Sequence, residues 1–143
     1  MDAKEYLGQV RLLDELIQNK AVEAYQLRCL ATSCTAPTDR EPMGSGGVSD
    51  RVGNIVAKLV DLEEETNRII DQYIDLKQDC IRVIESVKNP LWYTILHKYY
   101  IQYKTFVQIA EEEGYAYPYV CEIHGKAVAE VQKILDGKKG NKK

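Results

Sequence analysis

The most regular pattern of apolar positions lies in the middle of the chain, over residues 49–88. Apolar side chains recur there in alternating steps of three and four residues, and only Thr66 interrupts them. This spacing keeps one stripe of a helix apolar and is typical of coiled-coil packing. It predicts one long helix, with Ser49 as its N-cap, that needs an apolar partner along its length. The apolar positions are Val52, Ile55, Leu59, Leu62, Ile69, Tyr73, Leu76, Cys80, Val83 and Val87.

A second amphipathic helix is predicted over residues 2–32. It opens with Asp2 and Glu5, whose spacing suits a capping arrangement. The proline- and glycine-rich stretch 34–48 then predicts a linker. The long helix has two ways to cover its apolar stripe: the first helix can fold back against it, or a second copy of the chain can supply the surface. We predict a coiled-coil-like antiparallel hairpin for residues 1–88, and we also expect a homodimer through the long helices.

The pattern changes after this hairpin. Asn89 and Pro90 end one helix and begin another, because Asn is a good N-cap and Pro suits the first helical position. Shorter amphipathic stretches follow, so that residues 89–136 form a three-helix module and the whole chain is expected to be all-α. The lysine-rich residues 137–143 are expected to be disordered. The predicted helices of the module cover about 90–102, 105–114 and 118–135.

Residues 105–124 contain the spacing of a helix-turn-helix. Thr105 and Gln108 form a T-x-x-Q capping box at the start of the first helix. The small Ala110 suits the point where two crossing helices approach, and Gly114 accepts the positive φ that the turn requires. Branched apolar residues on the second helix close the small core. The predicted motif core is Ile109, Ala110, Gly114, Val120 and Ile123.

Charge and hydropathy narrow the functional classes. The net charge of the 143 residues is −3, but residues 1–89 carry 11 Lys/Arg against 16 Asp/Glu, whereas residues 90–143 carry 8 against 6. The positive balance of the C-terminal part is weak support for an anionic partner there. No apolar run approaches the roughly 20 residues of a membrane span, and no signal peptide opens the chain. We therefore expect a cytoplasmic protein without a membrane partner.

Catalytic and metal-binding motifs are not found in the sequence. None of the four cysteines forms a C-x-x-C pair, and the two histidines do not group with them at zinc-like spacing. There is no phosphate loop, nucleophile elbow or H-E-x-x-H. We therefore expect neither an enzyme nor a protein that holds a metal or cofactor.

The segment IAEEEGY, at 109–115, and the apolar positions of the last helix resemble region 4 of the primary bacterial sigma factors, over residues 91–135. The whole layout is also similar to a family of small Gram-positive phage proteins, late-gene transcription regulators that place a helical N-terminus before such a module. The resemblance implies a phage or prophage regulator that acts at a promoter in a bacterial host, through double-stranded DNA or RNA polymerase. The last-helix positions that match the family's buried residues are Val120, Ile123, Ala127 and Val128.

The resemblance also implies which residues face the DNA. Three features depart from the sigma pattern: Glu113 replaces a buried leucine, Ala116 replaces a Ser/Thr cap, and the arginines of the recognition helix are absent. Arginine therefore cannot read guanine in this helix. The remaining expected contacts are those of the tyrosines, of Glu122 with cytosine, and of His124 and Lys126 with the DNA backbone. The expected recognition residues are Tyr117, Tyr119, Cys121, Glu122, His124 and Lys126, and the expected DNA-backbone contacts are Lys104, Thr105 and Tyr103.

We therefore expect a transcriptional regulator of the late-gene activator type that binds promoter or operator DNA. One alternative is a DNA-packaging subunit that resembles a phage small terminase, in which the coiled coil builds a ring. The other is an adaptor that binds RNA polymerase or a sigma factor and does not contact DNA. The molecular mass separates a ring from a dimer, and a mobility shift separates a DNA-binding protein from an adaptor.

Overall fold

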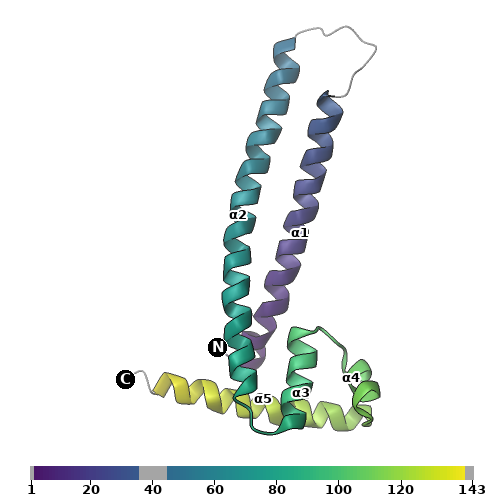
Figure 1. Ribbon diagram of the computed structural model, residues 1–143, viewed down its shortest axis with the longest axis vertical. Helices are drawn as coiled ribbons and strands as arrows, with labels where there is room; N and C mark the ends of the chain where they lie inside the picture. The colour runs from purple at the N-terminus through teal and green to yellow at the C-terminus, as the bar shows by residue number, and fades with distance from the viewer. Residues whose placement is uncertain (1, 36–44, 141–143) are drawn as a thin grey trace. The chain divides into compact units, whose positions relative to one another are not determined.

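The computed structural model describes residues 2–35 and 45–140 (Figure 1). All regular secondary structure in these two ranges is helical, which confirms the all-α prediction. None of the helices described is long and apolar enough to cross a membrane. The elements are α1 (Ala3–Thr35), α2 (Ser45–Glu85), α3 (Pro90–Leu96), the π-helix η1 (His97–Ile101), α4 (Phe106–Glu113) and α5 (Tyr117–Gly140).

Two helix boundaries differ from the sequence prediction. Helix α2 begins at Ser45, so Ser49 lies inside the helix and is not its N-cap. Of the predicted linker 34–48, residues 36–44 lie outside the described part of the chain. Helix α5 continues to Gly140, into the tail that was expected to be disordered. Residues 141–143 of that tail lie outside the described part of the chain. The helix continues because Gly lowers helix propensity by only about 1 kcal/mol and Lys is a good helix former, so composition alone does not end a helix.

The chain divides into two compact units, one made of Met1–Leu13 with Tyr73–Lys143 and the other of Asp14–Gln72. In the second unit, Lys20 of α1 pairs with Glu65 of α2, and Arg28 pairs with Glu63, at N–O distances of 3.4 and 2.7 Å. The order of these pairs along the two helices shows that α1 and α2 run antiparallel. The first unit joins the N-terminal part of α1 and the C-terminal part of α2 to the helices that follow. This grouping differs from the division at residues 88 and 89 that the sequence suggests.

The main core of the first unit is built from both ends of the chain. Leu7 and Val10 of α1 lie fully buried with Val83 of α2 and Val131 of α5. The Ala3 amide donates to Gln132 Oε1 at 2.8 Å, which ties the start of α1 to α5. The C-terminal helices therefore share one apolar core with the base of the α1–α2 pair. Its other buried members are Ala3, Cys80, Ile84, Val87, Leu96, Tyr100, Ile101, Ala127 and Val128.

The predicted third helix is an α-helix followed by a π-helix. The Asn89 side chain caps α3, since its Oδ1 accepts from the Leu91 and Trp92 amides at 3.0 and 3.4 Å. The chain then widens into η1, where the Gln102 amide donates to the His97 carbonyl at 3.1 Å. A π-helical turn carries an extra residue and is frequent at functional sites.

Candidate nucleic-acid interface

The turn between α4 and α5 is held by local backbone chemistry. The capping box is formed as the sequence predicted: the Thr105 hydroxyl accepts from the Gln108 amide at 3.2 Å, and the Thr105 amide donates to Gln108 Oε1 at 2.9 Å. At the other end, Gly114 has φ 74° and ψ 31°, and its amide donates to the Ala110 carbonyl at 2.9 Å. This left-handed residue ends α4 and redirects the chain into α5.

A small apolar core holds the two helices together. Ile109 and Ala110 of α4 are buried against Val120 and Ile123 of α5, and Ile95 of α3 completes the cluster. The four side chains predicted for this core are therefore buried, and Gly114 forms the turn. Partly buried residues pack around the cluster: Leu91, Trp92, Tyr99 and Phe106.

The first half of α5 presents an exposed face. Tyr117 and Tyr119 are 50% and 40% exposed, and Glu122 and Lys126 follow on the same helix, also exposed. Tyr115, which the sequence analysis did not select, joins this surface, with its ring centroid 5.1 Å from that of Tyr119. We call Tyr115, Tyr117, Tyr119, Glu122 and Lys126 the α5 face.

The charge of the α5 face is low. Lys126 Nζ lies 3.5 Å from Glu122 Oε1, one helical turn away, so its positive charge has an acidic neighbour. Cys121 is half-buried, and its hydrogen bond with the Tyr117 hydroxyl raises the pKa of that hydroxyl. Cys121 therefore lies beside Tyr117 of the α5 face and is less exposed than the tyrosines.

His124 is the clearest correction to the predicted site. It is only 7% exposed, and its Nε2 shares a hydrogen bond of 2.8 Å with the Tyr100 hydroxyl. Burial, with a smaller contribution from the Lys4 charge, lowers the pKa of His124 to about 4, so the imidazole is neutral at pH 7. His124 lies on the same side of α5 as Val120 and Val128, four residues from each, and both of these are buried.

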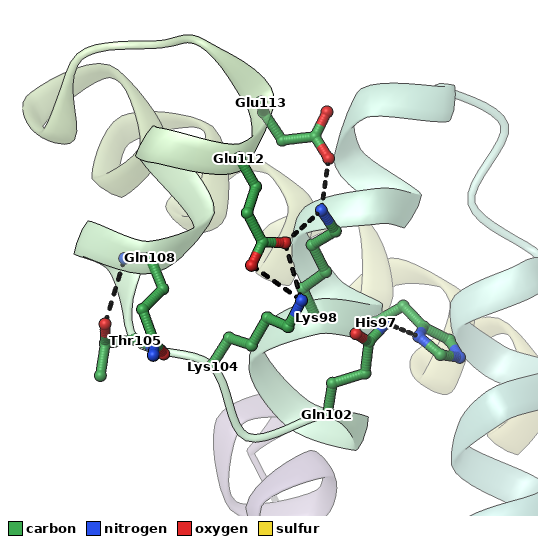
Figure 2. Close-up of polar contacts among 8 residues, drawn as sticks. All are labelled: His97, Lys98, Gln102, Lys104, Thr105, Gln108, Glu112 and Glu113. Atoms are coloured by element: carbon green, nitrogen blue, oxygen red, sulfur yellow. Dashed lines mark hydrogen bonds and ion pairs between the residues drawn. The ribbon is translucent and has the colours of Figure 1, made fainter.

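Two of the three predicted phosphate contacts are engaged inside the protein. Lys104 Nζ lies 2.7 and 2.8 Å from the two carboxylate oxygens of Glu112 (Figure 2). Tyr103 has φ 61°, and its hydroxyl lies 3.4 Å from that of Tyr73. Thr105 is exposed, but its hydroxyl already accepts from the Gln108 amide. The polar atoms of Lys104 and Tyr103 thus already have partners within the protein, and their contact with DNA stays a prediction.

Glu112 and Glu113 of α4 belong to an ion-pair network that the sequence analysis missed. Lys98 Nζ of η1 lies 2.7 Å from both Glu112 and Glu113 (Figure 2). Hydrogen bonds from Lys104 and then Lys98 lower the pKa of Glu112, and the pKa of Lys98 is raised by the same contacts. The carboxylate of Glu113 is thus half-buried against a cation.

Comparison with known proteins adds no further constraint. No family model, no curated protein and no solved structure matches the chain. In the described ranges, no group of three or more His, Cys, Asp or Glu side chains is placed to hold a metal ion.

Proposed function

We propose that the protein is a phage-encoded transcriptional regulator that binds double-stranded DNA through a sigma region-4-like helix-turn-helix formed by α4 and α5. The observation that supports this most directly is the α4–α5 arrangement: a left-handed Gly114 turn and a closed apolar core, with Tyr117 and Tyr119 exposed at the start of α5. In helix-turn-helix proteins the second helix enters the major groove and its N-terminal residues meet base edges. The α5 face is the surface to which the proposal assigns this role.

The residues of the α5 face determine what kind of binding is expected. Tyrosine hydroxyls donate to phosphates or base edges, tyrosine rings contact thymine methyl groups, and Glu122 accepts from the cytosine amino group. Lys126 is the one cation of the face, and Glu122 shares its charge. Since phosphate neutralisation supplies most of the affinity of DNA-binding proteins, a single module is expected to bind weakly.

A homodimer would compensate for this weak binding. Two linked modules contact two half-sites, so that the second contact forms at a high effective concentration. The α1–α2 pair offers an apolar surface for a second copy, because large apolar side chains on both helices remain exposed there. Within Asp14–Gln72 these are Leu16, Val22, Tyr25, Leu30, Val56 and Val60.

Fluorescence anisotropy with labelled double-stranded DNA tests the proposal. The wild-type protein should bind with an affinity that falls as salt rises. Replacing Tyr119→Ala and Lys126→Gln together should weaken binding at least about tenfold, which corresponds to roughly 1.4 kcal/mol. Glu122→Gln should instead strengthen it, because a carboxylate beside the phosphates is removed and Lys126 loses its partner.

Lys133→Gln is the matched control, since it removes the same charge from an exposed position seven residues further along α5. It should leave the affinity within about twofold of wild type, because surface charges far from the contact have small effects. If the double variant binds DNA as tightly as the control does, the α5 face is not the DNA-binding surface.

The adaptor alternative is supported by a different observation. Lys98 and Lys104 are ion-paired with glutamates, and Tyr115, Tyr117 and Tyr119 form an exposed aromatic surface. Tyrosine is enriched at protein–protein interfaces, where it supplies much of the binding energy. An absence of DNA binding, combined with binding to RNA polymerase or a sigma factor that Tyr119→Ala abolishes, would favour the adaptor. Light scattering addresses the packaging alternative, since a small-terminase-like ring has many more subunits than a dimer.

A further inference from the structure

A pocket lies inside the first compact unit, on the inner side of α5 and apart from the α5 face. It has a volume of about 380 Å³ and lies between the N-terminal turns of α1 and the aromatic residues of η1, α4 and α5. Pockets that hold small molecules usually have volumes of about 300–1,000 Å³. We call it the α1 pocket. Its lining is Lys4, Gly8, Arg11, Tyr99, Tyr100, Phe106 and His124.

One wall of the α1 pocket is a packed group of rings. The rings of Tyr99 and Phe106 are stacked, with centroids 4.4 Å apart and planes 9° from parallel. The His124 ring contacts both, with centroids 5.2 and 4.9 Å away. The Tyr100–His124 hydrogen bond holds this ring in place at 2.8 Å. The wall is therefore pre-formed, and it offers ring faces and edges to a planar ligand.

The opposite side of the α1 pocket carries positive charge. Lys4 and Arg11 are seven residues apart on α1 and both line the pocket, whereas no lining residue is acidic. Gly8 lies midway between them and leaves open space, because a Cβ built at this position would have no atom within 4 Å. An ammonium and a guanidinium on one helix face suit a phosphate, which arginine can bind in a bidentate manner.

From this arrangement we propose that the α1 pocket binds a small anion that carries a planar ring, with a nucleoside monophosphate as the class of ligand. The base packs against the Tyr99–Phe106–His124 wall, and the phosphate meets Lys4 and Arg11. The Tyr100–His124 pair supplies polar atoms at the edge of the ring. Tight binding requires both the base and the phosphate of the ligand. The aromatic wall has no cation to bind a phosphate, and the α1 side has no aromatic ring to pack against a base.

Isothermal titration calorimetry of the full chain with AMP, GMP, CMP and UMP tests the proposal. At least one nucleotide should bind, and the matching nucleoside or inorganic phosphate alone should bind at least about tenfold more weakly. Gly8→Leu fills the pocket without a backbone clash, and leucine is a better helix former than glycine, so the variant should fold while binding is lost. Lys4→Gln combined with Arg11→Gln should weaken binding by at least about tenfold.

Matched variants on α2 control for these changes. Gly53→Leu makes the same substitution at a helical glycine with open space in the other compact unit, and Arg51→Gln with Arg68→Gln removes two exposed positive charges. Both should bind the nucleotide as the wild type does. The proposal is overturned if none of the four nucleotides binds, or if the Gly8→Leu variant binds as tightly as Gly53→Leu. These outcomes do not depend on DNA binding, so they test the pocket separately from the proposed function.

Discussion

Gly114 determines the direction in which α5 leaves α4. Its φ of 74° is a conformation that costs an L-residue with a Cβ about 1–2 kcal/mol, and no atom lies within 4 Å of a Cβ built there. Gly114→Ala should therefore lower the free energy of unfolding by about 1–2 kcal/mol through the backbone alone, as measured by urea denaturation. Gly125→Ala should raise it by about 0.5–1 kcal/mol, because Gly125 lies inside α5 with open space around it. Equal effects of the two substitutions would contradict this account.

His124 should make stability depend on pH. Its pKa is about 4 in the folded protein against 6.5 in a model peptide, so the unfolded chain binds a proton first as the pH falls. The resulting stability is fully present above about pH 6.5 and is lost progressively toward pH 4, by roughly 2–3 kcal/mol. The titratable groups that face the imidazole are Lys4 from α1 and Tyr99 and Tyr100 from η1.

Urea denaturation of wild type and His124→Gln between pH 7 and pH 4.5 measures this contribution. Glutamine retains hydrogen-bonding atoms for Tyr100 but does not titrate. The variant should lose less stability than the wild type over this range, because the contribution of the carboxylates and of His97 is common to both proteins. Parallel curves for the two proteins would show that His124 is not the group responsible.

At the level of elements, the start of α5 is weakly capped. The Val120 amide donates to the Ala116 carbonyl at 3.1 Å, which places Ala116 at the N-cap of α5. Pro118 has no amide hydrogen, so Tyr119 carries the amide that a capping side chain would accept from. Ala116→Ser should therefore raise the free energy of unfolding by about 1 kcal/mol in thermal or urea melts. Ala129→Ser, exposed in the middle of α5, should instead lower it by about 0.5 kcal/mol, since serine is the poorer helix former.

The ion pairs between η1 and α4 orient the first helix of the proposed motif. Lys98 reaches Glu112 and Glu113 together, and Lys104 also binds Glu112, so both glutamates are turned toward η1. These pairs offset the charge of Glu112 and Glu113, whereas Glu111 of the same run is exposed. They also use two of the lysines that a DNA-binding surface would need.

At the level of the whole molecule, the C-terminal helices depend on α1 and α2 for part of their core. Leu96, Ala127 and Val131 are fully buried in the same cluster as Leu7 and Val83. A fragment of residues 89–143 would expose these apolar side chains and should show no cooperative unfolding transition. A chain in which residues 14–72 are replaced by a short Gly/Ser loop keeps the first compact unit and should unfold cooperatively by circular dichroism. A stable 89–143 fragment would show that the division at residue 88 is the correct domain boundary.

Much of the secondary structure and of the motif core was predictable from local patterns. The Asn89 cap, the Thr105–Gln108 capping box and the Gly114 turn each depend on residues within four positions of one another, and all three are present. Helical spacing also identified the buried positions Ile109 and Val120. Tyr117 and Tyr119 are exposed as well, and so is Pro118 between them in the first turn of α5.

The state of individual polar side chains was not predictable in this way. Helical periodicity says which face of a helix is apolar, but it does not say which neighbour covers a particular polar residue. His124 is buried because Tyr100 and Phe106, from other elements, lie against it. Lys104 is neutralised because Glu112 folds back within reach. Such contacts join residues that the chain brings together only after the helices pack.

By itself, the sequence determined an all-α chain, the main breaks between its helices and the apolar residues that hold α4 to α5, because helix formation and capping depend on near neighbours. Only the tertiary structure decided that the C-terminal helices share a core with α1 and α2, that His124 is buried, and that Lys98 and Lys104 are ion-paired. It also brought Lys4 and Arg11 to the aromatic wall of the α1 pocket. These outcomes depend on distances between residues far apart in the chain, which local spacing does not contain.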